Sequence, residues 1–417
     1  MNIGSRIVTI LIYLYVIFQP LLPGKYKING IPFNGDAILA LAILIYVVSA
    51  ILFVDSRRRF ISGVKNFFMS SIGIFMFLLI FIMLVSTSYA ESRTIALSEA
   101  ARFVSYIGLF FIIKYEFSSQ KIIDNILRLY ITSVFIVGII GIIEGIFGIG
   151  FVQQSEHGIR DRVFSTMENS NNLGAFMVIA IFPIIMLLLK ERNKIKKNVY
   201  LFLMLIALTN IIICYSRNAW IGLAIGCVIL GLIYSWKIIL ALVVLGGGSL
   251  FIPAISNRLA EFTDASQNMS RIKLWDIAWF MIKDHPIRGV GNGNYRVMYD
   301  KYKLLLKQKI EYYPSNNFHP HNILLKVQSE LGVFGTGAFL GMVISIFCRI
   351  LKFTREIDDE FYTPFFKGFL ASFIAFMGMN LIDNFFSAPK VIAFFWLLIA
   401  CFESVMYRKQ REGDLYY

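Results

Sequence analysis

The feature that most constrains this chain is a succession of long apolar stretches separated by short polar segments. About twelve of them approach the roughly 20 mostly apolar residues that a helix needs to cross a bilayer. They lie at roughly 5–22, 37–54, 67–89, 95–113, 126–147, 172–189, 199–214, 219–234, 237–252, 322–348, 364–386 and 390–407. Hydrophobic residues make up 57% of the chain and the mean hydropathy is +0.68, which excludes an ordinary soluble domain. We therefore expect an all-α integral membrane protein.

The distribution of basic residues predicts the topology. A net charge of +14 could indicate nucleic-acid binding, but the basic residues gather in alternate short loops between apolar stretches. Loops rich in Lys and Arg stay in the cytoplasm. This pattern predicts a multi-pass protein of the cytoplasmic membrane, with both termini inside and residues 253–321 outside. The first apolar run, Ile7 to Phe18, lacks a small-x-small cleavage site after it, so we expect a retained helix and not a signal peptide.

Three regions follow from this topology. We expect nine transmembrane helices in residues 1–252, an extracytoplasmic loop over 253–321, and three more helices with a short cytoplasmic tail in 322–417. The fourth stretch is interrupted by Arg102, which predicts a tilted or short helix there.

The outer loop contains a candidate amphipathic helix. Residues 271–282 place Ile272, Trp275, Trp279 and Ile282 on one stripe, and Pro286 would end the helix. Such a stripe fits a helix at the membrane interface, or a small loop that packs on itself. The glycines at 289–294 predict a flexible turn. Because no strand precedes them, they do not form a nucleotide-binding loop.

Two of the four histidines, His319 and His321, lie where the outer loop meets the apolar run after residue 322. An imidazole titrates near neutrality, so it can accept a proton from a substrate hydroxyl. Alternatively, these histidines cap the helix or contact lipid headgroups. No nearby Cys or carboxylate completes a tetrahedral zinc set around the pair, so we expect no metal site. The outer loops also lack an Asp-x-Asp pair, which disfavours metal-dependent glycosyl transfer.

Several arginines are predicted on the outer side, where topology does not call for positive charge, among them Arg160, Arg162, Arg217, Arg271 and Arg288. Guanidinium groups match phosphate oxygens and keep their charge. Together they could stabilise a diphosphate leaving group beside a base. For any single arginine, snorkelling to lipid headgroups is the competing interpretation.

Amides and acids complete the set of candidates. Asn169 and Asn171 precede an apolar stretch and could cap its helix or hydrogen-bond a sugar. Glu330 falls inside the helix predicted after His321, where a buried carboxylate is either functional or paired with an arginine. Asp383 is a weaker case of the same kind.

Four motifs, in order over about 160–335, resemble the O-antigen ligase and polymerase family. They are Arg162…Asn171-Asn172; Ser216-Arg217-Asn218-Ala219-Trp220; Arg271…Trp275 with Asp284 to Gly291; and His321-Asn322 with Gly332-Val333-Phe334-Gly335. Asn218 stands where the family usually has glycine.

The resemblance implies a C-type membrane glycosyltransferase that needs neither metal nor cofactor. Such enzymes move a glycan, with inversion, from an undecaprenyl-diphosphate carrier to an acceptor hydroxyl on a glycan, lipid or protein. Carried over by motif, His321 would be the base, and Arg217 and Arg271 would hold the diphosphate with Arg162 as a third. The residues in possible acceptor or supporting roles are His319, Asn169, Asn171, Asn322, Arg288 and Glu330.

A transporter or flippase for a lipid-linked or anionic solute is the alternative, since it too would have many helices and buried charges. Paired half-sequences typical of that class are not evident. The sequence does not separate a polymerase from a ligase, because both use the same donor chemistry.

Overall fold

A computed structural model describes residues 2–24, 27–28, 31–32, 34–117, 119–155, 158–249, 256, 265–306 and 319–413. Its helices are α1 (Ile3–Leu21), α2 (Gly35–Leu52), α3 (Val54–Met69), α4 (Ser71–Ser86), α5 (Arg93–Phe111), η1 (Ile112–Glu116), α6 (Gln120–Phe147), α7 (Ser170–Lys190), α8 (Lys194–Ile213), α9 (Arg217–Ile233), α10 (Lys237–Ser249), α12 (Ala265–Asp284), α13 (Tyr295–Lys303), α14 (Ile323–Glu356), α15 (Tyr362–Met379), η3 (Phe385–Ser387) and α16 (Pro389–Glu412). Two antiparallel hairpins pair β1 (Lys27–Ile28) with β2 (Ile31–Pro32) and β3 (Phe151–Ser155) with β4 (Gly158–Arg162).

Eight described helices are long and apolar enough to cross a bilayer, or nine if α3 and α4, bent by 88°, form one broken span. The predicted all-α, multi-pass class is confirmed. The number of about twelve spans stays a prediction, because α9 and α10 have only 17 and 13 residues. The basic segment between the second and third predicted spans is helical, since it forms α3.

The centre of the bundle is formed by α7 and α16, whose spans are 78% and 94% buried. The α7 helix packs against α8, α9 and α15, while α16 contacts α5, α6 and α14. Farther along α16, the buried Glu403 carboxylate pairs with Lys114 at 2.8 Å and with Arg349 at 2.6 Å. This helix therefore joins the elements around it through both apolar and ionic contacts.

The α14 helix is broken at Gly332, which has a φ of 65° and a ψ of −165°. The segment after α12 packs along this break. Val290 donates to the Ser329 carbonyl at 2.8 Å, Gly291 to the Glu330 carbonyl at 2.9 Å, and the Val333 N–H to the Pro286 carbonyl at 3.1 Å. The break thus exchanges helical hydrogen bonds for bonds to the segment between α12 and α13. The turn predicted within 289–294 is present, and its residues are buried.

The helix predicted at 271–282 is confirmed as part of the longer α12, which ends before Pro286. A different face, with Leu274, Ile277 and Met281, is buried and packs against α13. Of the predicted stripe, Ile272 and Trp279 are 44% and 50% exposed, whereas Ile282 is 8% exposed. The placement of the stripe at the membrane interface stays a prediction.

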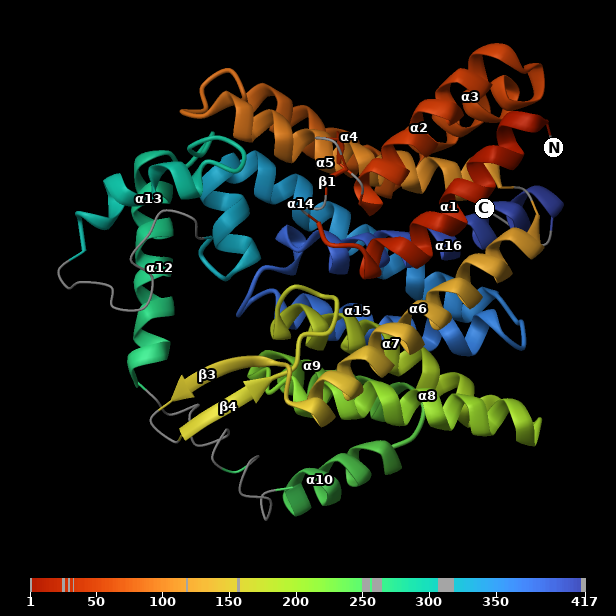
Figure 1. The fold of residues 1–417 in the computed structure, drawn as a ribbon. Helices are drawn as coiled ribbons and strands as arrows, with labels where there is room; N and C mark the ends of the chain where they lie inside the picture. The colour runs from red at the N-terminus through yellow and green to blue at the C-terminus, as the bar shows by residue number, and fades with distance from the viewer. Residues whose placement is uncertain are drawn as a thin grey trace.

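Figure 1 shows α12 running across the ends of the bundle helices, beside α13 and the β3–β4 hairpin. Both chain termini and α3 lie toward the opposite end of the bundle. The α3 helix carries Arg57, Arg58 and Arg59, so a dense group of basic residues lies at the end with the termini.

Candidate functional site

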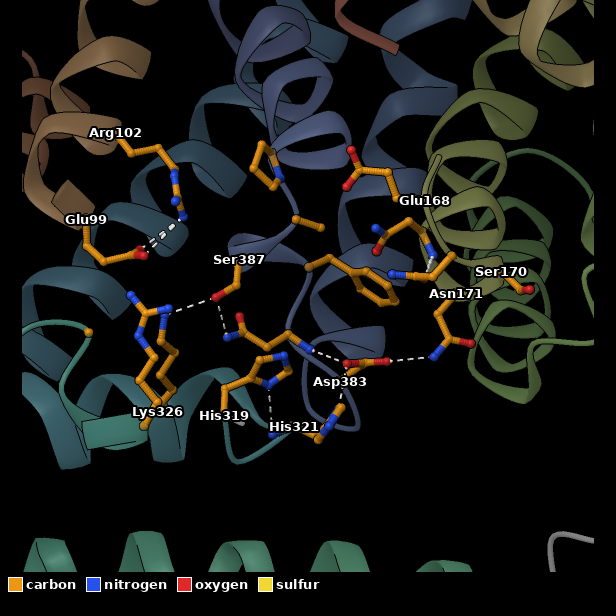
Figure 2. A pocket seen from close by; sticks show the side chains of 18 of the residues that line it. Glu99, Arg102, Glu168, Ser170, Asn171, His319, His321, Lys326, Asp383 and Ser387 are labelled. Atoms are coloured by element: carbon orange, nitrogen blue, oxygen red, sulfur yellow. Dashed lines mark hydrogen bonds and ion pairs between the residues drawn. The ribbon is translucent and has the colours of Figure 1, made fainter. Parts of the chain in front are cut away.

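A polar pocket of about 710 Å³ lies at the α12 end of the bundle. Its walls come from α5, the start of α7, the start of α14 and the turn that connects α15 to α16. Figure 2 shows Arg102, Glu99 and Lys326 on one side, His321 and Asp383 in the middle, and Asn171 on the other side. The segments that meet here are far apart in the sequence, so the pocket exists only in the folded bundle.

At the middle of the pocket, His321 is held by a carboxylate. Its Nδ1 lies 2.8 Å from Asp383 Oδ1, which also accepts the backbone N–H of Asn384 at 2.9 Å. His321 has a φ of 47°, an uncommon left-handed conformation for a residue with a side chain. Its backbone N–H donates to His319 Nδ1 at 3.2 Å. Such an outlier, held by surrounding bonds, is typical of functional positions.

The charge of Asp383 determines which ring nitrogen of His321 carries the proton. Burial opposes ionisation of Asp383, but the hydrogen bond from His321 and nearby positive charge outweigh it and lower the pKa of this carboxyl group. An ionised carboxylate only accepts hydrogen bonds, so His321 Nδ1 must donate. With the proton on Nδ1, Nε2 is the ring nitrogen that can accept a proton, which is the requirement for a base.

Its neighbour His319 stays uncharged. Desolvation, followed by the electrostatic interaction with His321, lowers the pKa of His319 to about 3. A neutral His319 is also what its contact requires, because Nδ1 must keep its lone pair to accept the His321 N–H. His319 therefore orients the backbone of His321 without adding charge to the pocket.

A hydrogen-bonded chain leads from the central pair to the α7 side. Asn171 Nδ2 donates to Asp383 Oδ2 at 3.2 Å, and Asn171 Oδ1 accepts from Arg162 Nη2 at 3.0 Å. Arg162 Nε also donates to the Cys214 carbonyl at 3.1 Å. Asn169 caps α7 by accepting the Asn172 N–H at 2.8 Å, so the predicted capping role applies to Asn169.

The α5 and α14 side of the pocket carries paired charges. Arg102 lies 3.2 Å from Glu99, and Lys326 lies 3.9 Å from Glu330. Lys326 also donates to Ser387 Oγ at 3.0 Å. Glu330 accepts the backbone N–H groups of Gly293 and Tyr295 at 3.0 and 3.2 Å. Glu330 therefore connects the start of α13 to α14. Its ion-pair partner is Lys326, whereas the sequence had suggested an arginine.

The remaining predicted residues lie outside the pocket lining. Arg217 is the first residue of α9, next to the capping Ser216. Arg271 lies on α12, and its charge contributes to the low pKa of Asp383. Arg288 faces a separate small pocket and stacks over the Tyr89 ring at 5.2 Å. Asn322 caps α14 by accepting the N–H groups of Leu324 and Leu325.

Several lining residues were not among the predicted site residues, and the charged ones include Asp383, Lys326 and Arg296. A carboxylate within the apolar stretch 364–386 was the available signal for Asp383. Lys326 and Arg296 carried no comparable signal. Arg102 also lines the pocket, and its interruption of an apolar stretch had been visible in the sequence.

The histidine pair also has a carboxylate neighbour that the sequence did not reveal. Donor atoms of His319, His321 and Asp383 all lie within 4.8 Å of one another, close enough to hold a metal ion. The expectation that no carboxylate lies beside the pair is wrong, because folding brings the α15–α16 turn to it. Two imidazoles and a carboxylate are donors that zinc accepts.

The fold and the site together define a multi-pass membrane protein with a charged pocket, built around a histidine–aspartate pair, at one end of its helix bundle. Residues 202–340 match the family described as O-Antigen ligase. This range contains Arg217, Arg271 and His321.

Curated relatives agree with that match. The chain is 25% identical over 311 residues to a putative polysaccharide ligase of Rickettsia prowazekii, covering 71% of this chain and 73% of the relative. It is 23% identical over 373 residues to the O-antigen ligase of Salmonella typhimurium, covering 84% and 86%. A putative polysaccharide ligase of Rickettsia typhi is 25% identical over 276 residues, covering 63% and 65%. The predicted resemblance to the O-antigen ligase family is confirmed.

Proposed function

We propose that this protein is a membrane glycosyltransferase that moves a glycan from an undecaprenyl-diphosphate carrier to an acceptor hydroxyl. The observation that carries the proposal is the His321–Asp383 pair at the centre of a charged pocket, whose lining includes both cations and carboxylates. The similarity to an O-antigen ligase and to a putative polysaccharide ligase supports a glycan as the transferred group.

In the proposed reaction, His321 Nε2 takes the proton of the acceptor hydroxyl. The oxygen attacks the anomeric carbon and forms the new glycosidic bond, while the bond between that carbon and the diphosphate breaks. Attack from the face opposite the leaving group inverts the anomeric centre. Asp383 stabilises the imidazolium that forms. The cations of the pocket stabilise the diphosphate charge, so the reaction as proposed uses no metal.

The cation assignments carried over from the family differ in their support. Arg162 lines the pocket, and the charge of Arg271 reaches Asp383. We keep both as candidates for the diphosphate, together with Arg217 in the turn next to the Cys214 carbonyl that Arg162 contacts. Arg288, in its separate pocket, is better suited to positioning the outer segment.

The proposed topology places the pocket outside the cytoplasmic membrane. The basic α3 lies toward the end of the bundle that holds both termini, and Lys- and Arg-rich segments stay in the cytoplasm. The pocket at the other end then faces the exterior. This topology goes together with the prediction of about twelve spans, because an even number puts both termini on the same side. The predicted outer segment over 253–321 then includes α12 and α13.

Replacement of the base tests the function. We expect His321→Gln to lower glycan transfer by about 10²- to 10⁴-fold, the range for loss of a general base. His285→Gln is the matched control, since His285 lines the separate pocket. The assay combines purified protein in detergent, a defined undecaprenyl-diphosphate glycan and several labelled acceptors. Full activity of His321→Gln beside an equally active control would rule out the proposed base.

The same assay separates the remaining alternatives. Elongation of a lipid-linked glycan indicates a polymerase, whereas transfer to another lipid, protein or wall polymer indicates a ligase. Movement of the lipid-linked glycan across proteoliposomes without any transfer would instead favour the flippase.

A further inference from the structure

His319, His321 and Asp383 form a cluster of three side chains that all have the chemistry of metal ligands. Their donor atoms lie within 4.8 Å of one another, and Figure 2 shows the three residues together in the pocket. We propose that this His-His-Asp cluster binds a zinc ion reversibly and that the bound ion stops glycan transfer. The effect on transfer rests on the proposed function, whereas the binding of the ion does not.

The distances within the cluster suit a single ion. Zinc binds imidazole nitrogen and carboxylate oxygen at about 2.0–2.2 Å, so two ligands of one tetrahedral ion are roughly 3.4 Å apart. His321 Nδ1 and Asp383 Oδ1 are 2.8 Å apart, and the centroids of the two imidazoles are 4.4 Å apart. The donor atoms therefore need shifts of only about 1 Å to surround an ion.

The ligands are held in place before an ion arrives. Pro320 separates the two histidines, and its ring fixes the φ angle of the residue between them. Asp383 accepts from Asn171 Nδ2 at 3.2 Å with one oxygen and from the Asn384 N–H at 2.9 Å with the other. Hydrogen bonds of this kind orient the carboxylates that bind metals. Binding therefore requires little further ordering, which favours affinity.

The cluster can be reached from the pocket. The side chains of His321 and Asp383 are 16% and 9% exposed, and all three residues line the pocket of about 710 Å³. Three protein ligands leave the fourth tetrahedral position of zinc for a water molecule. An ion can therefore enter and leave through the pocket, in contrast to the ion of a closed structural site.

The donor atoms select among cations. Imidazole suits zinc, copper and nickel, whereas magnesium and calcium prefer sites built from oxygen ligands. Two imidazoles and one carboxylate therefore favour zinc over magnesium. This preference separates the proposed site from a general attraction of divalent cations to the carboxylates of the pocket.

Binding would remove the base whichever ring nitrogen of His321 the ion takes. An ion on Nε2 occupies the atom that receives the proton of the acceptor. An ion on Nδ1 replaces the hydrogen bond to Asp383, and the proton of the neutral imidazole is then on Nε2. In both cases Nε2 has no lone pair for the acceptor hydroxyl, so the transfer step stops.

Metal titration tests the site directly. The wild-type protein, purified without a polyhistidine tag, is titrated with Zn²⁺ in competition with a chromophoric chelator. We expect one ion per chain and at least a tenfold loss of affinity in His319→Gln and in His321→Gln, since loss of a supporting partner alone typically costs about 10- to 100-fold. His285→Gln is the matched control, because His285 lines the separate pocket. Equal affinity in all four proteins, or no stoichiometric binding, would mean an adventitious ion only and overturn the site.

Transfer assays test the consequence of binding. We expect saturating Zn²⁺ to lower transfer by the wild-type protein about 10²-fold or more, as for loss of the base. Addition of chelator should restore transfer, and the same concentration of Mg²⁺ should leave it unchanged. Normal transfer with the ion bound, or loss of transfer on chelation, would overturn the inhibitory role. Zinc bound at the cluster of a protein that transfers no glycan under any condition would keep the metal site and refute the proposed function.

Discussion

At the residue scale, the geometry of the base depends on one carboxylate 62 positions away in the sequence. Asp383 holds His321 Nδ1 and is itself held by Asn171 and by the Asn384 N–H. Each of these contacts limits the rotation of the carboxylate, and the carboxylate in turn limits the rotation of the imidazole. Asp383 is thus a positioning residue in the proposed reaction, because it acts on the acceptor only through His321.

Asp383→Asn separates this role from a structural one. An asparagine amide can donate to His321 Nδ1, which would move the imidazole proton to Nε2 and remove the base. We expect kcat to fall by about 10²- to 10⁴-fold with little change in the KM for the donor. Asp358→Asn in an exposed loop is the control. Equal losses in binding and turnover, or a normal kcat, would contradict the proposed tautomer.

The same scale shows what the sequence could predict of the site. His321, Arg162 and Asn171 were predicted from short motifs, since each motif keeps its residues close along the chain. The contact between His321 and Asp383 has no local pattern, because it forms only when α15 ends beside the start of α14. Lys326 resembles any helical lysine in the sequence, and its place in the pocket depends on how α14 faces α5.

At the element scale, α14 behaves as two helical segments joined at Gly332. The first segment carries Lys326 and Glu330 into the pocket, and the residues between α12 and α13 donate hydrogen bonds to its last carbonyl groups. The glycines at 289–294, which the sequence predicted as a flexible turn, are thus needed where this segment packs closely against neighbouring backbone, as Gly289 does against Glu330. Sequence patterns find such glycines but do not identify the backbone that they approach.

Gly332→Ala tests this junction. Its positive φ disfavours any side chain, and an added Cβ would collide with the Ile287 carbonyl oxygen. We expect a loss of roughly 2 kcal/mol or more in the free energy of unfolding, measured by thermal or denaturant unfolding in detergent. Gly337→Ala on the same helix is the control, since no atom lies within 4 Å of the added Cβ. Two variants of equal stability would argue against a strained junction.

At the scale of the whole molecule, the helical class followed from hydropathy alone, whereas the number of spans did not. Length and composition identify α6 or α7 with little ambiguity, because each has more than enough apolar residues. They cannot decide whether α3 and α4 form one broken span, since the 88° bend depends on tertiary packing. The side on which the pocket opens stays a prediction from loop charge.

Cysteine labelling tests the proposed sidedness. The four native cysteines are first replaced by serine, and Lys301→Cys on α13 is compared with Lys194→Cys at the start of α8, both at exposed positions. A membrane-impermeant maleimide should label the α13 variant in intact cells and the α8 variant only after lysis. The reverse pattern would place the pocket on the cytoplasmic side.

The central position of α16 has a consequence for assembly. Its sequence follows those of the helices that surround it, so they must enter the membrane before the helix that fills the space between them. Until Glu403 is in place, Lys114 and Arg349 lack their shared counter-ion. A nascent chain that stops short of α16 would therefore expose two unpaired cations and the apolar faces that α16 covers.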